Sequence, residues 1–230
     1  MISKKFIKEL AKMTGITDKA ILKYPITTLN SDAVDIIVNI DASKLDCSGF
    51  EDTGIYELNK FIHTFGLFND PEIRRTENSI EFQTPGQKSI FTVSDISLME
   101  SYNQKSEIIE ILKNFPSVAE VDLKDETIKK FKQASSIFNE LNVLTIEGKD
   151  GDTALYLDAH NRFNSSNNVY QREFLNTSKM NFKLKINIEN FNKLPSTDYK
   201  LLIKYNEEKQ AFRIVFVAEN FKILISRITD

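Results

Sequence analysis

The chain has 230 residues, with 30 Lys and Arg against 33 Asp and Glu, and its net charge of −3 excludes a protein held on nucleic acid or anionic lipid by bulk positive charge alone. Its 41% hydrophobic and 27% charged residues are typical of a globular chain and exclude wholesale disorder. The length fits one large domain or two of about 115 residues, and the single cysteine, Cys47, excludes an internal disulfide.

The first third of the chain predicts a helix, a strand and a second helix. Ser3 is a typical helix cap, and apolar residues recur at helical spacing behind it until Gly15 ends the helix. Residues 33–40 are rich in β-branched side chains and predict a strand. Residues 55–65 carry apolar side chains on one helical face, with Gly66 behind them.

Two short strands are expected next, over residues 79–83 and 89–93, with turns at 77–78 and 85–86. Residues 100–117 are polar at first and then apolar, which suggests a connector. A third helix is predicted over about 125–141, because Asp125 and Glu126 lie in its first turn, where the helix dipole favours anions.

The last part of the chain alternates strands with one short helix. Strands are expected at 143–146, 154–157, 182–186, 212–217 and 221–225, with a turn at 206–209. A short helix at 188–194 stops at Pro195.

The order helix, strands, helix, strands therefore occurs twice, with little residue identity between the halves. We expect an α+β fold of two similar domains, each an antiparallel sheet with two helices on one face. The expected boundaries are 1–105 for the N-terminal domain, 106–118 for the connector and 119–230 for the C-terminal domain.

Catalytic and metal-binding motifs are absent from the sequence. The two histidines, His63 and His160, are far apart, and no nucleophile elbow, phosphate-binding loop or dinucleotide fingerprint is present. Asp150 and Asp152 could serve a metal nuclease, but Gly151 between them favours a hairpin turn. We therefore expect no enzymatic activity, no cofactor and no metal site.

No apolar run approaches the roughly 20 residues of a membrane-spanning helix, and the lysine-containing N-terminus lacks the continuous apolar stretch of a signal peptide. We expect no membrane partner and a cytoplasmic location, which is the host cytoplasm if the protein is viral.

Lysines recur on the polar side of all four predicted helices, and they are candidates for facing DNA. They are Lys4, Lys5, Lys8, Lys12, Lys60, Lys129, Lys130, Lys132 and Lys193. Each stripe taken alone is typical of a solvated helix face. If all four helices lay on one side of two sheets, the lysines would form a positive surface about as wide as a duplex, suited to sequence-independent phosphate contact.

Three stretches, in this order and spacing, resemble the sliding clamps (DNA polymerase processivity factors) of T-even-type tailed bacteriophages, which belong to the ring-clamp superfamily. The stretches are residues 55–61 with 67–70 and a hairpin over 72–82, residues 118–121 with 143–148, and residues 190–195 with 198–202. The resemblance implies the DNA-clamp fold and a homotrimeric ring around double-stranded DNA, lined by helices.

The resemblance also implies the partners. The ring would be placed by a clamp loader and would tether the replicative DNA polymerase, which gains effective concentration at the primer end. Subunits would pair through edge strands, for which the candidates are Ile90, Phe91, Val93, Val169, Tyr170 and Phe174. A partner-peptide pocket would involve Phe115, Pro116, Ile223 and Ile225, although ordinary core packing explains the same residue types.

A competing function is a protein- or ligand-binding module that forms no ring, such as a phage assembly or scaffold factor. Such a module would be monomeric, with its lysines facing bulk water. A nuclease that uses Asp150 and Asp152 is a more remote alternative.

Overall fold

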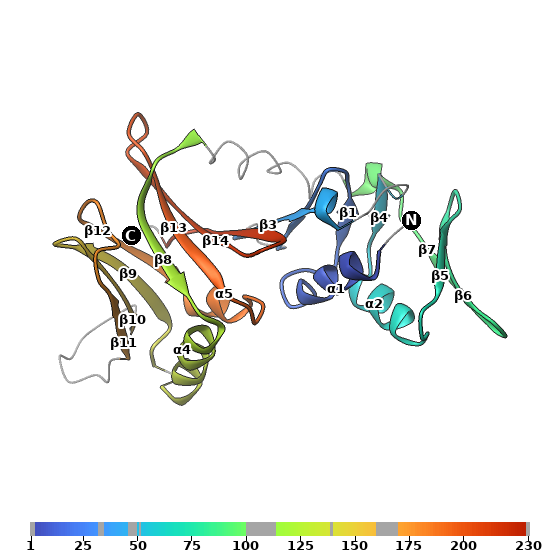
Figure 1. Ribbon diagram of the computed structural model, residues 1–230, viewed down its shortest axis with the longest axis horizontal. Coiled ribbons are helices and arrows are strands. Elements are labelled where there is room, and N and C mark those ends of the chain that lie inside the picture. The colour runs from blue at the N-terminus through green and yellow to red at the C-terminus, as the bar shows by residue number, and fades with distance from the viewer. Residues whose placement is uncertain are drawn as a thin grey trace. The chain divides into compact units, whose positions relative to one another are not determined.

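The computed structural model describes residues 3–31, 35–45, 50, 52–99, 114–138, 140–159 and 170–228 (Figure 1). The chain divides into two compact units, Met1–Ile108 and Ile109–Asp230. Val169 and residues 106–113 of the expected connector lie outside the described residues.

The described part of the N-terminal unit contains two α-helices, two short 3₁₀ helices and seven strands. The helices are α1 (Lys4–Lys12), η1 (Ala42–Lys44), α2 (Leu58–Gly66) and η2 (Ile96–Leu98). The strands are β1 (Ala20–Leu22), β2 (Ile26–Asn30), β3 (Ile36–Asp41), β4 (Thr53–Ile55), β5 (Glu72–Arg75), β6 (Ser79–Thr84) and β7 (Gln87–Thr92).

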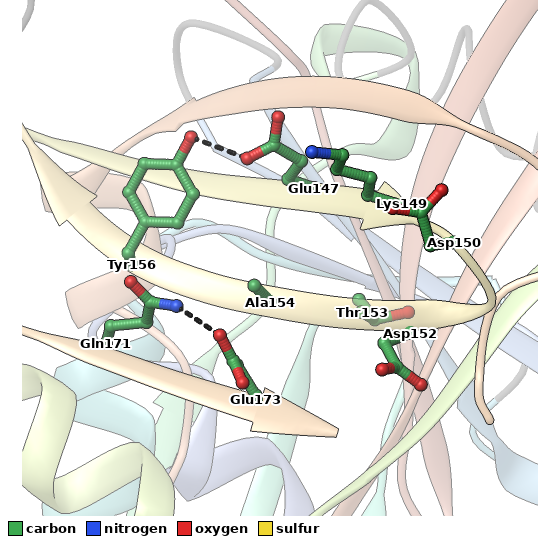
Figure 2. A pocket seen from close by; sticks show the side chains of 9 residues that line it. All are labelled: Glu147, Lys149, Asp150, Asp152, Thr153, Ala154, Tyr156, Gln171 and Glu173. Atoms are coloured by element: carbon green, nitrogen blue, oxygen red, sulfur yellow. Dashed lines mark hydrogen bonds between the residues drawn. The ribbon is translucent and has the colours of Figure 1, made fainter. Parts of the chain in front are cut away.

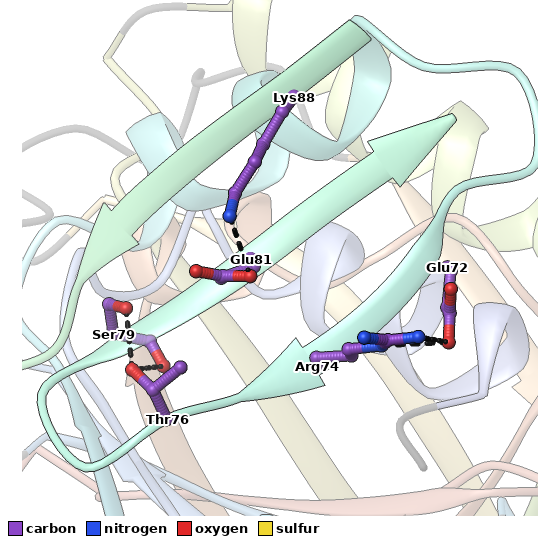
Figure 3. Close-up of polar contacts among 6 residues, drawn as sticks. All are labelled: Glu72, Arg74, Thr76, Ser79, Glu81 and Lys88. Carbon is purple, nitrogen blue, oxygen red and sulfur yellow. Dashed lines mark hydrogen bonds and ion pairs between the residues drawn. The ribbon is translucent and has the colours of Figure 1, made fainter. Parts of the chain in front are cut away.

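The strands of this unit form two antiparallel groups, in the orders β4-β1-β2-β3 and β5-β6-β7. Figure 3 shows the second sheet. Lys88 of β7 pairs with Glu81 of the neighbouring strand β6 (2.9 Å), and Arg74 pairs with Glu72 within β5 (2.8 Å). Such surface pairs contribute little to stability.

Aromatic packing joins α2 to the second sheet. Phe61 is fully buried, and its ring centroid lies 5.5 Å from that of Phe82 and 5.3 Å from that of Phe91. Helices α1 and α2 also pack against each other. The apolar face of α2 therefore contacts strands β6 and β7, and its polar face remains exposed.

The described part of the C-terminal unit repeats this plan with two α-helices and eight strands. The helices are α4 (Asp125–Ile137) and α5 (Ile188–Asn192). The strands are β8 (Ser117–Leu123), β9 (Val143–Lys149), β10 (Asp152–Asp158), β11 (Gln171–Phe174), β12 (Phe182–Asn187), β13 (Tyr199–Asn206), β14 (Ala211–Val217) and β15 (Phe221–Ile225).

Here too the strands form two antiparallel groups, in the orders β8-β13-β14-β15 and β11-β10-β9-β12. Phe131 of α4 is fully buried and meets Phe191 of α5 edge-on, with ring centroids 6.2 Å apart. Phe191 in turn lies 6.3 Å from Phe216 of β14. This aromatic chain joins both helices to the first sheet.

The structure confirms the expected α+β architecture with antiparallel sheets, and each unit divides its strands between two sheets. The hairpin turn between β9 and β10 is also confirmed, with Asp150 and Gly151 at positive φ (53° and 95°).

The largest differences from the predicted helix bounds are at the start of α2 and the end of α4, and α5 also ends earlier than predicted, at Asn192. Ile55 belongs to β4, where it pairs with Ala20, so α2 begins at Leu58. Helix α4 ends at Ile137 because Phe138 leaves the helical region (φ −105°, ψ 74°). Leu141 is buried as predicted, but it belongs to the turn after α4 and not to the helix.

Candidate nucleic-acid interface

Helix α1 separates its apolar and basic residues onto different sides. Ser3 caps the helix by accepting a hydrogen bond from the backbone amide of Phe6 (3.1 Å). The side chains of Phe6 and Leu10 are fully buried, whereas Lys5 and Lys8 are exposed. The helix therefore presents cations on the side opposite its core contacts.

The other two lysines of α1 form ion pairs. Lys4 lies 2.5 Å from the carboxylate of Asp70, and Lys12 lies 2.9 Å from that of Glu9. Both lysines remain partly exposed, with 49% and 38% of their side-chain surface accessible.

In helix α4 two of the lysines are paired with carboxylates one turn earlier. Lys129 lies 2.5 Å from Asp125 and Lys130 lies 2.6 Å from Glu126. The hydrogen bond between Lys130 and Glu126 raises the pKa of the lysine and lowers the pKa of the glutamate. Each charge stabilises the other, so the exposed side of α4 is close to neutral.

Lys132 differs from its neighbours because it is half-buried. Its ammonium group donates a hydrogen bond to the backbone carbonyl of Leu194 (2.5 Å), just after α5. Burial lowers the pKa of Lys132. This lysine therefore joins α4 to the end of α5, a role that its sequence position does not reveal.

Helix α2 and the C-terminal cap of α5 each add one of the predicted lysines. Lys60 is exposed and pairs with Glu57 (3.1 Å), and His63 is exposed on the same helix. Lys193, at the C-terminal end of α5, is exposed, and no ion pair or side-chain hydrogen bond joins it to another described residue.

Two aspartates that the sequence reading missed hold the first turns of α2 and α4. Asp18 accepts hydrogen bonds from Leu58 through its carbonyl (2.7 Å) and from Asn59 through its carboxylate (2.8 Å). Asp198 accepts a hydrogen bond from the amide of Asp125 (2.9 Å). The residues at the cap positions, Glu57 and Lys124, make no such bond. Both capping residues come from distant parts of the chain, so no sequence motif next to α2 or α4 predicts them.

The predicted subunit-interface residues that the structure describes lie on two outermost strands or beside them, and Val169 is outside the described residues. β7 ends the order β5-β6-β7 and β11 ends the order β11-β10-β9-β12 within the described chain. Ile90 is 59% exposed, whereas Phe91 is buried against Phe61. Val93 and Phe174 are half-buried. Half-buried Tyr170 meets Phe131 edge-on, with 4.8 Å between the ring centroids.

The four predicted pocket residues fall into two groups. Phe115 is half-buried and Pro116 is exposed, and their backbone carbonyls accept hydrogen bonds from Lys204 and from the amide of Tyr205. Ile223 and Ile225 are buried in β15, with at most 1% of their surface accessible. Their burial is what the core-packing alternative expects.

A cavity of about 450 Å³ lies over β9, β10 and β11, and it contains both candidate nuclease aspartates (Figure 2). Asp150 and Asp152 point in different directions there, and Asp152 accepts a hydrogen bond from the amide of Asn176 (2.7 Å). Within the described parts of the chain, no three His, Cys, Asp or Glu side chains are grouped to hold a metal ion. The Asp-Gly-Asp sequence thus acts as a turn that is fixed to the segment after β11.

No model of a protein family matches the sequence, and no curated protein matches it either. Solved structures do match. PCNA from Entamoeba histolytica is similar over 98% of this chain and 95% of its own, with a TM-score of 0.65 and 10% identity. The beta chain of DNA polymerase III from Streptococcus pneumoniae TIGR4 is similar over 98% of this chain, with a TM-score of 0.65 and 12% identity. This chain spans 63% of the length of that beta chain.

A third match is the structure of A. fulgidus PCNA with the C-terminal region of FEN-1 bound. The similarity covers 97% of this chain and 95% of the matched chain, with a TM-score of 0.65 and 9% identity. This chain has the sliding-clamp fold. In this clamp fold the lysine-bearing helices α1 and α2 lie side by side in the N-terminal unit, as α4 and α5 do in the C-terminal unit (Figure 1). The described helices of the clamp fold lack the length and apolar character needed to cross a membrane.

Proposed function

We propose that this protein is a DNA sliding clamp, a ring that encircles duplex DNA and tethers a DNA polymerase without catalysing a reaction itself. The observation that carries the proposal is the clamp fold with exposed lysines on α1, α2 and α4 and at the C-terminal cap of α5. A closed ring needs only weak contact with phosphates, because it leaves a long duplex only by opening or at an end. A net charge of −3 is compatible with this mechanism.

We further propose a homotrimer, placed on DNA by a clamp loader and serving the replicative polymerase of a T-even-type phage in the host cytoplasm. Its domains are 1–105 and 119–230, joined by the connector 106–118. The compact units Met1–Ile108 and Ile109–Asp230 support this division.

Subunits are proposed to join through the edges of β7 and β11, with Ile90, Phe91 and Val93 on one side and Val169, Tyr170 and Phe174 on the other. An outermost strand has unpaired backbone groups, which a strand from a neighbour satisfies. The high exposure of Ile90 supports this assignment, because burial in an interface would remove it from water.

The A. fulgidus PCNA structure contains a bound C-terminal region of FEN-1, and we propose that this chain also binds peptide segments of its partners. The surface positions of Phe115 and Pro116 make them the accessible candidates. Ile223 and Ile225 would support such a pocket from the core.

Threading onto DNA with blocked ends tests the ring. A linear duplex with biotin at both ends is mixed with the protein, streptavidin is added to block the ends, and the salt concentration is raised to remove proteins that are held by charge. We expect the protein to stay on the duplex. The matched control adds streptavidin first, which should prevent retention. Equal retention in both orders, or none in either, would rule out a ring and would favour the module that forms none.

A further inference from the structure

The lysines of α1 and α4 differ in their surroundings. In α1, Lys5 and Lys8 are exposed, and neither makes an ion pair or a side-chain hydrogen bond with any residue that the structure describes. In α4, Lys129 and Lys130 each lie within 2.6 Å of a carboxylate. Lys132 is turned toward the carbonyl of Leu194. The two helices therefore offer unequal numbers of free cations.

We propose that α1 supplies most of the phosphate contact and that Asp125 and Glu126 weaken the contact made by the lysines of α4. The proposal rests on the sliding-clamp function. Among the described residues of α4, α5 and their caps, the free cation is then Lys193, at the C-terminal cap of α5. Each subunit thus touches DNA mainly through its N-terminal unit.

Helix geometry explains why the carboxylates of α4 matter even though surface ion pairs are weak. Residues four positions apart lie on the same face, so Glu126 faces whatever Lys130 faces. The side chain of Glu126 is 76% exposed. A phosphate that approaches Lys130 also approaches this carboxylate, and the two like charges repel each other. If Lys130 leaves Glu126 to contact a DNA phosphate, the net gain in binding free energy is therefore small.

The first turns of the two helices support the same distinction. Asp125 and Glu126 occupy the first turn of α4, where the helix dipole stabilises anions, and Asp198 adds a third carboxylate there. The first turn of α1 has no acidic residue and begins with Lys4 and Lys5. A cation at this end of a helix is unfavourable for stability. Lys4 is compensated by Asp70, but Lys5 has no carboxylate partner among the described residues, so stability does not explain the position of Lys5.

Salt dependence of DNA binding tests the proposal, because the logarithm of the binding constant falls with the logarithm of salt concentration by about 0.9 for each phosphate contact. Binding to a short fluorescent duplex with open ends is measured by anisotropy over a range of KCl concentrations. The variants are Lys5→Ala with Lys8→Ala, and Lys129→Ala with Lys130→Ala. Alanine is a good helix former, so both helices should persist. Lys23→Ala with Lys209→Ala is the matched control, since both lysines are exposed in loops and the charge change is equal.

The quantity compared is the steepness with which the logarithm of the binding constant falls with the logarithm of the KCl concentration. We expect the α1 variant to reduce this slope by at least about 0.9, and the α4 variant to reduce it by less than half as much. The control should leave the slope unchanged. Glu126→Gln should increase the slope, because it releases Lys130. Equal reductions for the α1 and α4 variants, or an unchanged slope for Glu126→Gln, would overturn the proposal.

The retention experiment with blocked duplex ends separates this inference from the proposed function. If the wild-type protein is retained but the α1 and α4 variants change the slope equally, the ring stands and the division between helices is wrong. If the wild-type protein is not retained, the sliding-clamp function itself fails, whatever the slopes are.

Discussion

The carboxylate of Asp198 caps helix α4 from a position 73 residues later in the chain, by accepting a hydrogen bond from the backbone amide of Asp125 (2.9 Å). Its second oxygen lies 2.9 Å from the ammonium group of Lys124. One side chain from the loop before β13 thus fixes the first turn of the helix that carries Lys129 and Lys130. The interface candidates of α4 depend on this contact for their position.

Replacing Asp198 with alanine should destabilise the C-terminal unit, because the amide of Asp125 loses its acceptor. We expect the midpoint of thermal unfolding to fall by about 2–4 °C, as is usual for a lost cap in a chain of this size. Asp198→Asn is the matched control, since it keeps an oxygen for the amide and loses only the charge. Circular dichroism measures both variants, and an alanine variant as stable as wild type would contradict the capping role.

The same contact predicts a pH dependence. The amide of Asp125, with a further contribution from Lys124, lowers the pKa of Asp198 below its ordinary value of 3.8. A lowered folded-state pKa adds stability above the unfolded-state pKa, and this stability is lost as the pH falls through the folded-state value. The advantage of wild type over Asp198→Asn should therefore be constant near neutral pH and shrink below about pH 4. An advantage that grows on acidification would contradict the assignment.

Local signals in the sequence account for the elements that were predicted. Ser3 caps α1 as expected, and the Asp150–Gly151 turn joins β9 to β10. The boundaries that were wrong depend on distant contacts. Ile55 leaves the helical pattern because it pairs with Ala20 in a neighbouring strand. No spacing within residues 55–65 contains that information.

In the candidate interface, too, the sequence predicts what depends on local spacing and misses what depends on distant contacts. The exposure of Lys5 and Lys8 follows from the spacing of the apolar residues in α1. The position of Lys132 does not, because its partner is a backbone carbonyl at Leu194. Asp198 was also missed, because a cap that comes from another loop has no sequence signature.

Phe131 should be a sensitive core position in the C-terminal unit, because it is fully buried and joins α4 to both Tyr170 and Phe191. We expect Phe131→Ala to lower the free energy of unfolding by about 3–5 kcal/mol. Phe131→Leu fills more of the cavity and should cost less. Chemical denaturation measures both changes, and a loss of stability that is the same for alanine and leucine would show that the site is not tightly packed.

Ile90 provides a direct test of the proposed subunit interface. Ile90→Arg should break the assembly and reduce the mass in solution to that of one chain, because a charge cannot be buried there without a partner. Ile137→Arg is the matched control, since Ile137 is also a highly exposed isoleucine (64% against 59%) and lies at the end of α4. A loss of assembly in both variants, or in neither, would argue against the β7 edge as the interface.

The mass of the wild-type protein in solution tests the central claim most directly. A closed homotrimer predicts a single species of about 80 kDa by light scattering, three times the 26.5 kDa of one chain. A stable species of 26.5 kDa at tens of micromolar protein would contradict the ring, and with it the proposal that this chain encircles DNA.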